Sequence, residues 1–158
     1  MWSVGAVTMV RTAVAADLEA IREVFRAASL SNAGDRTALL AHPELLVWPG
    51  TTIAEGRTRV AVDDGAIVGF ATAVPVDEEW ELEDLFVRPG RMRHGVARRL
   101  VEDILILAAR SGVRTVRVTA NPHAMAFYTA VGFVTDGTAQ TRFGPVPRLR
   151  LDVTDPCR

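Results

Sequence analysis

The sequence has little of the chemistry on which disulfides, metal sites and thiol catalysis depend. It contains one cysteine, Cys157, and three histidines, at positions 42, 94 and 123. A single cysteine excludes a disulfide within the chain, and the histidine spacing matches no metal site. We therefore expect no bound metal, and we interpret Cys157 as part of a loose tail rather than as a nucleophile.

Long apolar runs and a strong net charge are also missing. No apolar stretch approaches the roughly 20 residues that span a bilayer. The apolar residues 1–10 are not preceded by the basic region of a signal peptide. The net charge of −1 gives no field that attracts nucleic acid or acidic lipid. These absences predict a cytoplasmic protein without membrane or nucleic-acid partners.

The composition is that of a soluble globular domain. Hydrophobic residues make up 49% of the chain and charged residues 23%, which are ordinary values for such proteins. A chain of 158 residues is long enough to bury most of its apolar surface in one domain. No repeat, low-complexity tract or linker interrupts it. We expect a single domain over residues 1–158, with its core at about 9–153.

Hydrophobic periodicity predicts an α/β domain with a mixed sheet of six to seven strands and about four helices. Because a helix separates the strands at 81–87 and 113–120, these two should be parallel and joined by a right-handed crossover. Asp63-Asp64-Gly65 is a strong hairpin signal. The last two strands are expected to be joined by a polar loop. Strands are predicted near 9–13, 57–62, 67–76, 81–87, 113–120, 133–135 and 147–153, and helices near 16–30, 37–48, 96–110 and 122–131.

The stretch 81–100, ELEDLFVRPGRMRHGVARRL, is the centre of this pattern. It predicts a strand that ends at Pro89, a short basic loop and a helix that begins after Gly95. A helix N-terminus presents unpaired N–H groups and the positive end of the helix dipole, so it suits an anion. Gly95 allows a ligand to approach the backbone, and nearby side chains add positive charge: Arg91, Arg93, His94, Arg98 and Arg99. We infer a ligand that carries phosphate.

Spacing separates the kinds of phosphate ligand. Gly90 and Gly95 have the interval of a P-loop, but Val96 and Ala97 stand where Lys and Ser or Thr are required, and no G-x-G-x-x-G opens the helix. The stretch 92–97 resembles motif A of the GCN5-related N-acetyltransferases (GNAT), Q/R-x-x-G-x-G/A. Gly95 and Ala97 match that motif, whereas Met92 departs from its first position. This departure matters little if backbone N–H groups hold the phosphates.

A second stretch strengthens the resemblance. Residues 121–133, NPHAMAFYTAVGF, are similar to GNAT motif B, N-x-x-A-x-x-F-Y-x-x-x-G-F, one strand downstream of motif A. The resemblance extends from about Arg11 to Val153. The matching positions of motif B are Asn121, Ala124, Phe127, Tyr128, Gly132 and Phe133.

The resemblance implies a GNAT fold that uses acetyl-CoA as co-substrate. In this family two parallel central strands splay apart, and the pantetheine arm pairs with backbone groups of the first of them. A backbone N–H near Phe86 or Val87 is then expected to polarise the thioester oxygen, and Asn121 to lie near the pantetheine arm. The implied pantetheine strand is Leu85, Phe86 and Val87, and the implied pyrophosphate site is Met92, Arg93, His94, Gly95, Val96, Ala97 and Arg98.

The resemblance also implies catalytic roles, each with a plainer alternative. Tyr128, the only tyrosine, matches the family's usual general acid toward the departing sulfur, although it could be an aromatic packing residue beside Phe127. Glu83 is the candidate base or anchor for the ammonium, although it could belong to a solvated acidic edge. Glu79, Glu81 and Glu83 alternate and should share one strand face, with Asp84 on the other. Trp48 and Trp80 line the acceptor pocket or pack in the core.

These implications lead to two hypotheses of function. The first is an N-acetyltransferase that moves the acetyl group directly to an amine of a small molecule or peptide. The acidic strand and the lack of a basic surface favour a cationic small molecule over nucleic acid. The second hypothesis is a non-catalytic module of the same fold that binds acyl-CoA. The acceptor site is expected in segments 29–58 and 138–148. Dimers are common in the family, and no exposed pattern decides whether this chain forms a homodimer.

Overall fold

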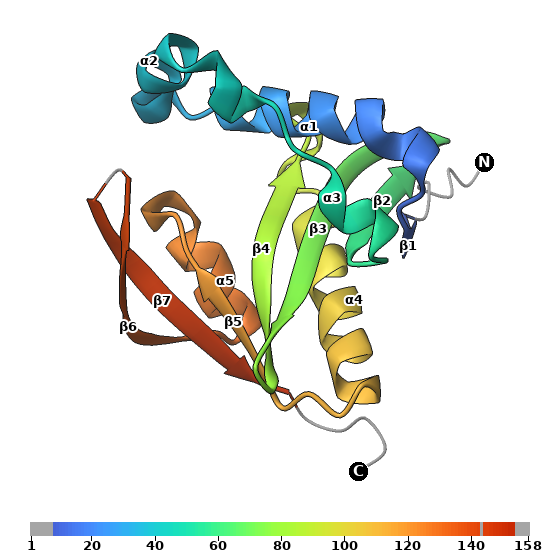
Figure 1. Cartoon of the computed structure of the whole chain (residues 1–158), viewed down its shortest axis with the longest axis vertical. Helices are drawn as coiled ribbons and strands as arrows, with labels where there is room; N and C mark the ends of the chain where they lie inside the picture. Colours follow the sequence, from blue (N-terminus) through green and yellow to red (C-terminus); the bar gives the residue numbers. More distant parts are fainter. Residues whose placement is uncertain (1–7, 143, 154–158) are drawn as a thin grey trace, which may run out of the picture. The chain divides into compact units, whose positions relative to one another are not determined.

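The structure is a computed structural model, and it describes residues 8–142 and 144–153 (Figure 1). Its strands form one seven-stranded sheet in the order β1-β2-β3-β4-β5-β7-β6. The strands are β1 (Met9–Thr12), β2 (Thr58–Asp63), β3 (Ala66–Val76), β4 (Glu79–Val87), β5 (Thr115–Thr119), β6 (Val134–Thr141) and β7 (Gly144–Asp152). The helices are α1 (Leu18–Leu30), α2 (Ala33–Ala41), α3 (Thr51–Ala54), α4 (Val96–Arg110) and α5 (Met125–Val131).

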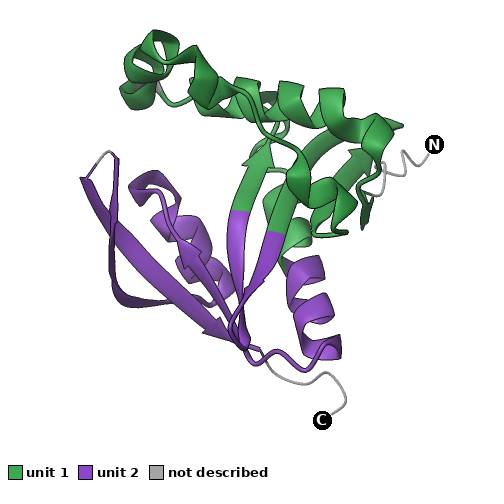
Figure 2. Ribbon diagram, viewed as in Figure 1, with its two compact units in different colours: residues 1–72, 84–101 green, residues 73–83, 102–158 purple. Residues whose placement is uncertain are grey.

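The chain divides into two compact units, coloured separately in Figure 2. Unit 1 contains residues up to 72 and residues 84–101, and unit 2 contains residues 73–83 and those from 102 onward. Strands β3 and β4 and helix α4 each contribute a part to both units. Cys157 lies outside the described residues. Within the described helices, none is both long and apolar enough to cross a membrane.

The core of unit 1 forms between helix α1 and the first strands. Ile21 and Val24, one helical turn apart, are fully buried, as the apolar stripe of this helix predicts. Trp48 packs edge-on against Phe70 with ring centroids 5.1 Å apart. The helix entry is fixed by Asp17, whose Oδ2 accepts a hydrogen bond from the Val14 amide at 2.8 Å.

Glycines shape unit 1 at two positions. The β2–β3 hairpin turns through Asp64 (φ 54°) and Gly65 (φ 77°), the left-handed pair that the Asp-Gly signal predicts. Gly69 in β3 allows α4 to pack closely on the sheet. A Cβ at Gly69 would lie 3.0 Å from both the Phe86 carbonyl oxygen and Val96 Cγ1, so a larger residue would displace the start of α4.

Unit 2 is built on the pairing of β5 with β4 and β7. β4 and β5 are parallel, with Trp80, Glu81 and Leu82 opposite Val116, Arg117 and Val118. β7 is antiparallel to β5 and to β6. The core of this unit is contributed by alternate strand positions and by helix α5, and its buried members include Leu82, Val116, Val118, Tyr128, Phe133 and Leu149.

The predicted α/β domain with a mixed sheet of six to seven strands is confirmed, and two local predictions were wrong. The second helix, predicted near 37–48, begins at Ala33 and ends at Ala41, and a 3₁₀ turn at Pro43–Leu46 follows it. The predicted polar loop is instead the β6–β7 hairpin, which starts at Val134. β6 is exposed along nearly its whole length, so it carries no apolar alternation to reveal a strand.

Candidate functional site

In unit 1, the start of helix α4 is the predicted anion site. The Arg99 amide donates to the Gly95 carbonyl at 3.0 Å, which is the first helical bond. The N–H groups of Val96 and Ala97 therefore have no acceptor within the helix. Gly95 is exposed and adopts φ 81°, and a Cβ built on it would meet nothing within 4 Å. The backbone is thus open to a ligand at this point.

The basic side chains around this helix start have different surroundings. Arg91 forms an ion pair with buried Asp63 of β2, which ties the loop to the sheet. The Arg99 guanidinium donates to the Thr8 carbonyl at 3.1 Å. Met92, Arg93 and His94 are exposed. Met92 is 51% exposed, so the departure from the motif lies at the surface.

The strand segment before this loop is held by aromatic packing. Phe86 stacks on Phe70 with centroids 5.5 Å apart and meets Phe25 of α1 edge-on at 4.9 Å. Leu85 and Val87 are half-buried on either side. Because the Phe86 ring is fixed in the core, the position of the backbone from Leu85 to Val87 is fixed as well.

Asp84, which the sequence analysis placed on the strand face opposite Glu83 and gave no role, has hydrogen-bond partners of its own. Its carboxylate accepts a hydrogen bond from Trp48 Nε1 at 3.0 Å and another from the Thr72 hydroxyl. Burial raises the pKa of Asp84, and the two hydrogen bonds offset only part of this rise. Trp48 is itself 4% exposed, so it packs in the core. Glu83, the predicted base, is exposed.

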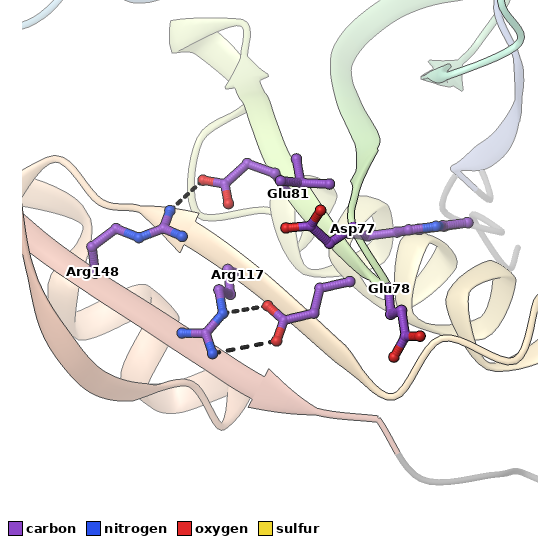
Figure 3. A pocket seen from close by; sticks show the side chains of 8 residues that line it. Asp77, Glu78, Glu81, Arg117 and Arg148 are labelled. Atoms are coloured by element: carbon purple, nitrogen blue, oxygen red, sulfur yellow. Dashed lines mark hydrogen bonds and ion pairs between the residues drawn. The ribbon is translucent and has the colours of Figure 1, made fainter.

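In unit 2, a pocket of about 760 Å³ lies on the sheet (Figure 3). Val116, Val118 and Leu149 are buried, and strand side chains alternate between faces, so Arg117 and Arg148 point to the face opposite this core. The lining residues are Val76, Asp77, Glu78, Glu79, Trp80, Glu81, Arg117 and Arg148. Glu79 and Glu81 share this pocket, as the strand alternation predicts.

Each arginine of the pocket is already bound by acidic groups. Arg117 forms ion pairs with Glu79 and Asp136, which raise the pKa of Arg117. Arg148 pairs with Glu81 and donates to the Thr119 hydroxyl at 3.0 Å. The lining holds four carboxylates and two guanidinium groups. Its net charge is therefore negative, which favours a cationic ligand over an anionic one.

Motif B lies in unit 2 and has the expected local structure. Asn121 Oδ1 accepts a hydrogen bond from the His123 amide at 2.9 Å, so Asn121 is the predicted cap. Tyr128 is 6% exposed and packs between Phe127 and Phe133. Burial raises the pKa of Tyr128 to about 12. The Tyr128 phenol therefore stays protonated at neutral pH.

Residues 18–133 match the profile of the Acetyltransferase (GNAT) family. This match spans most of the chain and includes both motifs. The chain belongs to the Acetyltransferase (GNAT) family. Among the residues that the structure describes, no three His, Cys, Asp or Glu side chains are grouped so that they could hold a metal ion.

Similar proteins carry names that agree with this membership. Uncharacterized N-acetyltransferases of Mycobacterium bovis and Mycobacterium tuberculosis are each 35% identical over 85 residues, which cover 51% of this chain and 54% of the relative. The chain thus matches about half the length of these curated relatives.

Two solved structures show the same fold. The PaiA N-acetyltransferase of Thermoplasma acidophilum, in complex with coenzyme A, superposes with a TM-score of 0.72 and 16% identity over 92% of this chain and 99% of the other. The ribosomal-protein-S18-alanine N-acetyltransferase of Escherichia coli superposes with a TM-score of 0.70 and 21% identity over 94% and 95%.

Proposed function

We propose that this protein is an N-acetyltransferase that moves the acetyl group of acetyl-CoA directly to an amine of a small molecule or peptide. The observation that carries the proposal is the open helix start at Gly95, which coincides with the phosphate motif of the family. The N–H groups of Val96, Ala97 and Arg98 would hold the pyrophosphate. Membership of the family and the relatives named N-acetyltransferases support this assignment.

The rest of the cofactor is assigned to β4 and to motif B. The pantetheine arm would pair with the backbone of Leu85, Phe86 and Val87, which aromatic packing holds in place. An N–H of the same segment would donate to the thioester oxygen as negative charge develops there. Asn121 would contact the pantetheine arm. The exposed Met92, Arg93 and His94 would contribute through their backbone rather than through a particular side chain.

Tyr128 is proposed as the hydrogen-bond and proton donor to the departing sulfur. A phenol with a pKa of about 12 is a weaker acid than a thiol, whose ordinary pKa is about 8.5, so Tyr128 would stabilise the forming thiolate chiefly by donating a hydrogen bond to it. The same high pKa ensures that the proton is present when it is needed.

The acceptor is proposed to be cationic. The unit 2 pocket presents an excess of carboxylates, and Glu83 lies two residues beyond Glu81 on the same strand. Glu83 is exposed, which suits an anchor for the acceptor's ammonium better than a base whose pKa must be raised by burial. The cytoplasmic location and the homodimer stay predictions.

The test is release of CoA thiol from acetyl-CoA with a panel of amines. The panel should pair cationic diamines with zwitterionic amino acids of similar length, and should include peptides with free amino termini. The sequence contains no lysine, so acetylation of the enzyme's own side-chain amines cannot produce the signal. Release with cationic amines supports the proposal. Tight binding of acetyl-CoA without release from any amine would favour the non-catalytic module instead.

A further inference from the structure

Strand β6 of unit 2 lies at the end of the sheet, and its outer edge is open. Among the described strands it pairs only with β7 (Figure 1), and seven of its eight residues are exposed. An open strand edge presents unpaired backbone N–H and C=O groups that can pair with another chain. Proteins commonly protect such an edge with a short strand, charged side chains, proline or a bulge. Which of these protections β6 carries therefore decides whether its edge can pair.

Only the first half of β6 is protected. The pairing register with β7 shifts between Thr135 and Thr138, so a bulge interrupts the strand there, next to the charged Asp136. From Thr138 to Thr141 the pairing with β7 is continuous. This segment reads TAQT and contains neither a charge nor a proline. Residues 138–141 are therefore the open edge of the strand.

Two prolines of β7 reveal which backbone groups of the open edge point outward. Gln140 stands opposite Pro145. Thr138 stands opposite Pro147, whose carbonyl accepts a hydrogen bond from the Ala120 amide at 3.0 Å and so faces away from β6. Opposite residues of an antiparallel pair exchange either both hydrogen bonds or none, and proline has no N–H, so both pairs are of the second kind. The N–H and C=O groups of Thr138 and Gln140 therefore point away from β7.

Such an edge is complementary to itself. When two β6 strands pair antiparallel about a twofold axis at Ala139, Thr138 of each copy lies opposite Gln140 of the other. Both residues point outward, so each of these pairs exchanges both of its N–H···O bonds. The same axis brings Asp136 opposite Arg142 of the second copy, because they stand three positions before and after Ala139. Both side chains are exposed and their charges are opposite. An axis at Thr138 or at Gln140 would place Arg142 opposite an uncharged residue instead.

We infer that residues 138–141 of β6 pair with the same edge of a second copy and so form a symmetric dimer with one continuous sheet. Asp136 pairs with Arg117 through Oδ2, and its side chain is still 41% exposed, so its carboxylate can accept a second guanidinium, that of Arg142. A twofold pairing occupies the open edge of both copies, so assembly stops at two. Because the edge is short, the dimer is weaker than one with a standard interface of roughly 1,600 Å².

Cysteine cross-linking tests the pairing and its register. Every variant also carries Cys157→Ser, so the introduced cysteine is the only thiol. About the inferred axis the two Ala139 residues face each other in a non-hydrogen-bonded pair, with Cα atoms about 4.5 Å apart, which a disulfide can bridge. Glu55→Cys, an exposed site in unit 1, gives the rate of random encounter. Under mild oxidation Ala139→Cys should cross-link about tenfold faster or more, because pairing raises the effective concentration of the two thiols.

Thr138→Cys and Gln140→Cys are the matched controls on the same edge. About the inferred axis each of these residues faces the other, not its own counterpart in the second copy. Both variants should therefore cross-link more slowly than Ala139→Cys. If Ala139→Cys is no faster than these two, the register is wrong. If all three cross-link only at the rate of Glu55→Cys, the open edge does not pair at all.

Sedimentation velocity with Gln140→Pro tests the dimer without a cross-link. A proline at 140 stands opposite Pro145 and removes an N–H that β7 does not use, so the melting temperature should stay near that of wild type. The sedimentation coefficient of wild type should rise with protein concentration up to about 1 mM, and that of Gln140→Pro should stay at the monomer value. A monomeric wild type, or a variant that dimerises equally well, would overturn the inference. Neither measurement involves acetyl transfer, so failure here leaves the proposed function untouched.

Discussion

The two units of this protein present polar groups in opposite ways. Around Asp84, unit 1 places neutral partners, the Trp48 indole and buried hydroxyls. Unit 2 uses charges in an open pocket, where Glu79 and Glu81 are paired with arginines. Strand β4 contributes carboxylates to both units, Asp84 to unit 1 and Glu79 and Glu81 to unit 2. The same strand therefore holds one carboxylate among neutral partners and two others in ion pairs.

The largest effect is expected in unit 1, at Gly95. Gly95→Glu places a carboxylate where the pyrophosphate would sit, and it also forces a side chain onto φ 81°. Like charges at such a distance cost several kcal/mol, so CoA affinity should fall by about 100-fold or more. Isothermal titration calorimetry with CoA measures this.

Gly112→Glu is the matched control for that variant. Gly112 follows the other end of α4, adopts φ 77°, and has equally open space around its Cβ. The control should share the backbone strain and keep wild-type CoA affinity. Similar losses in both variants would show that strain, not the phosphate site, explains the result.

The next largest effect is expected at Tyr128 in unit 2. Tyr128→Phe removes the proton donor while the ring still packs between Phe127 and Phe133. We expect kcat to fall about 10²-fold, with CoA affinity unchanged. Steady-state kinetics and the same calorimetric titration separate the two quantities. An unchanged kcat would show that Tyr128 only packs in the core and does not act as a donor.

The stability of the folded protein should distinguish buried from paired carboxylates. The pKa of Asp84 is higher in the folded than in the unfolded chain, where it is about 3.9. At a pH between these two values the folded state retains more protons than the unfolded state. The free energy of unfolding of the wild type therefore decreases as pH rises across that window. Asp84→Asn lacks this loss, and its stability relative to wild type should increase with pH.

Urea unfolding at several pH values measures this difference, with Glu81→Gln as the comparison. Glu81 is paired with Arg148 in the pocket, so Glu81→Gln controls for the loss of a carboxylate from the same strand. A stability difference for Asp84→Asn that is independent of pH would mean that Asp84 is not perturbed by burial.

The smallest effect is expected in the open pocket. Glu81→Gln removes one carboxylate of the lining and leaves Arg148 without its partner. The KM for a cationic amine should rise by roughly 2- to 10-fold, and less at high salt because the pocket is open to solvent. Glu55→Gln, an exposed change in unit 1, is the control. Equal KM values for Glu81→Gln and Glu55→Gln would show that the pocket does not bind the acceptor.

Local signals explain why most of the fold could be predicted from the sequence. Asp64-Gly65 specifies a tight hairpin, Asn121-Pro122 specifies a helix start, and Gly95 marks the start of α4. Each depends on neighbouring residues alone. The segments that were predicted wrongly lack such signals. The start of α2 is rich in turn-forming residues, and β6 is exposed and broken by a register shift between Thr135 and Thr138.

The candidate site could be predicted only where it depends on the backbone. The exposed helix start follows from a short motif, whereas the surroundings of Asp84 come from Trp48 and Thr72, which are far from it in sequence. Asp84 follows Glu83 in an acidic strand, and nothing in the neighbouring sequence indicates that its carboxylate is removed from solvent. The unit 2 pocket likewise requires β7 to bring Arg148 beside Glu81, 67 positions away in the chain.

The central claim is that the start of α4 binds acetyl-CoA, and the melting temperature of the purified protein against acetyl-CoA concentration tests it most directly. A ligand that binds only the folded state adds about 2.7 kcal/mol of stability at 100 times its Kd. The account predicts a rise in melting temperature that grows with acetyl-CoA and is lost in Gly95→Glu but kept in Gly112→Glu. A melting temperature that does not respond to acetyl-CoA, or a response retained by Gly95→Glu, would contradict it.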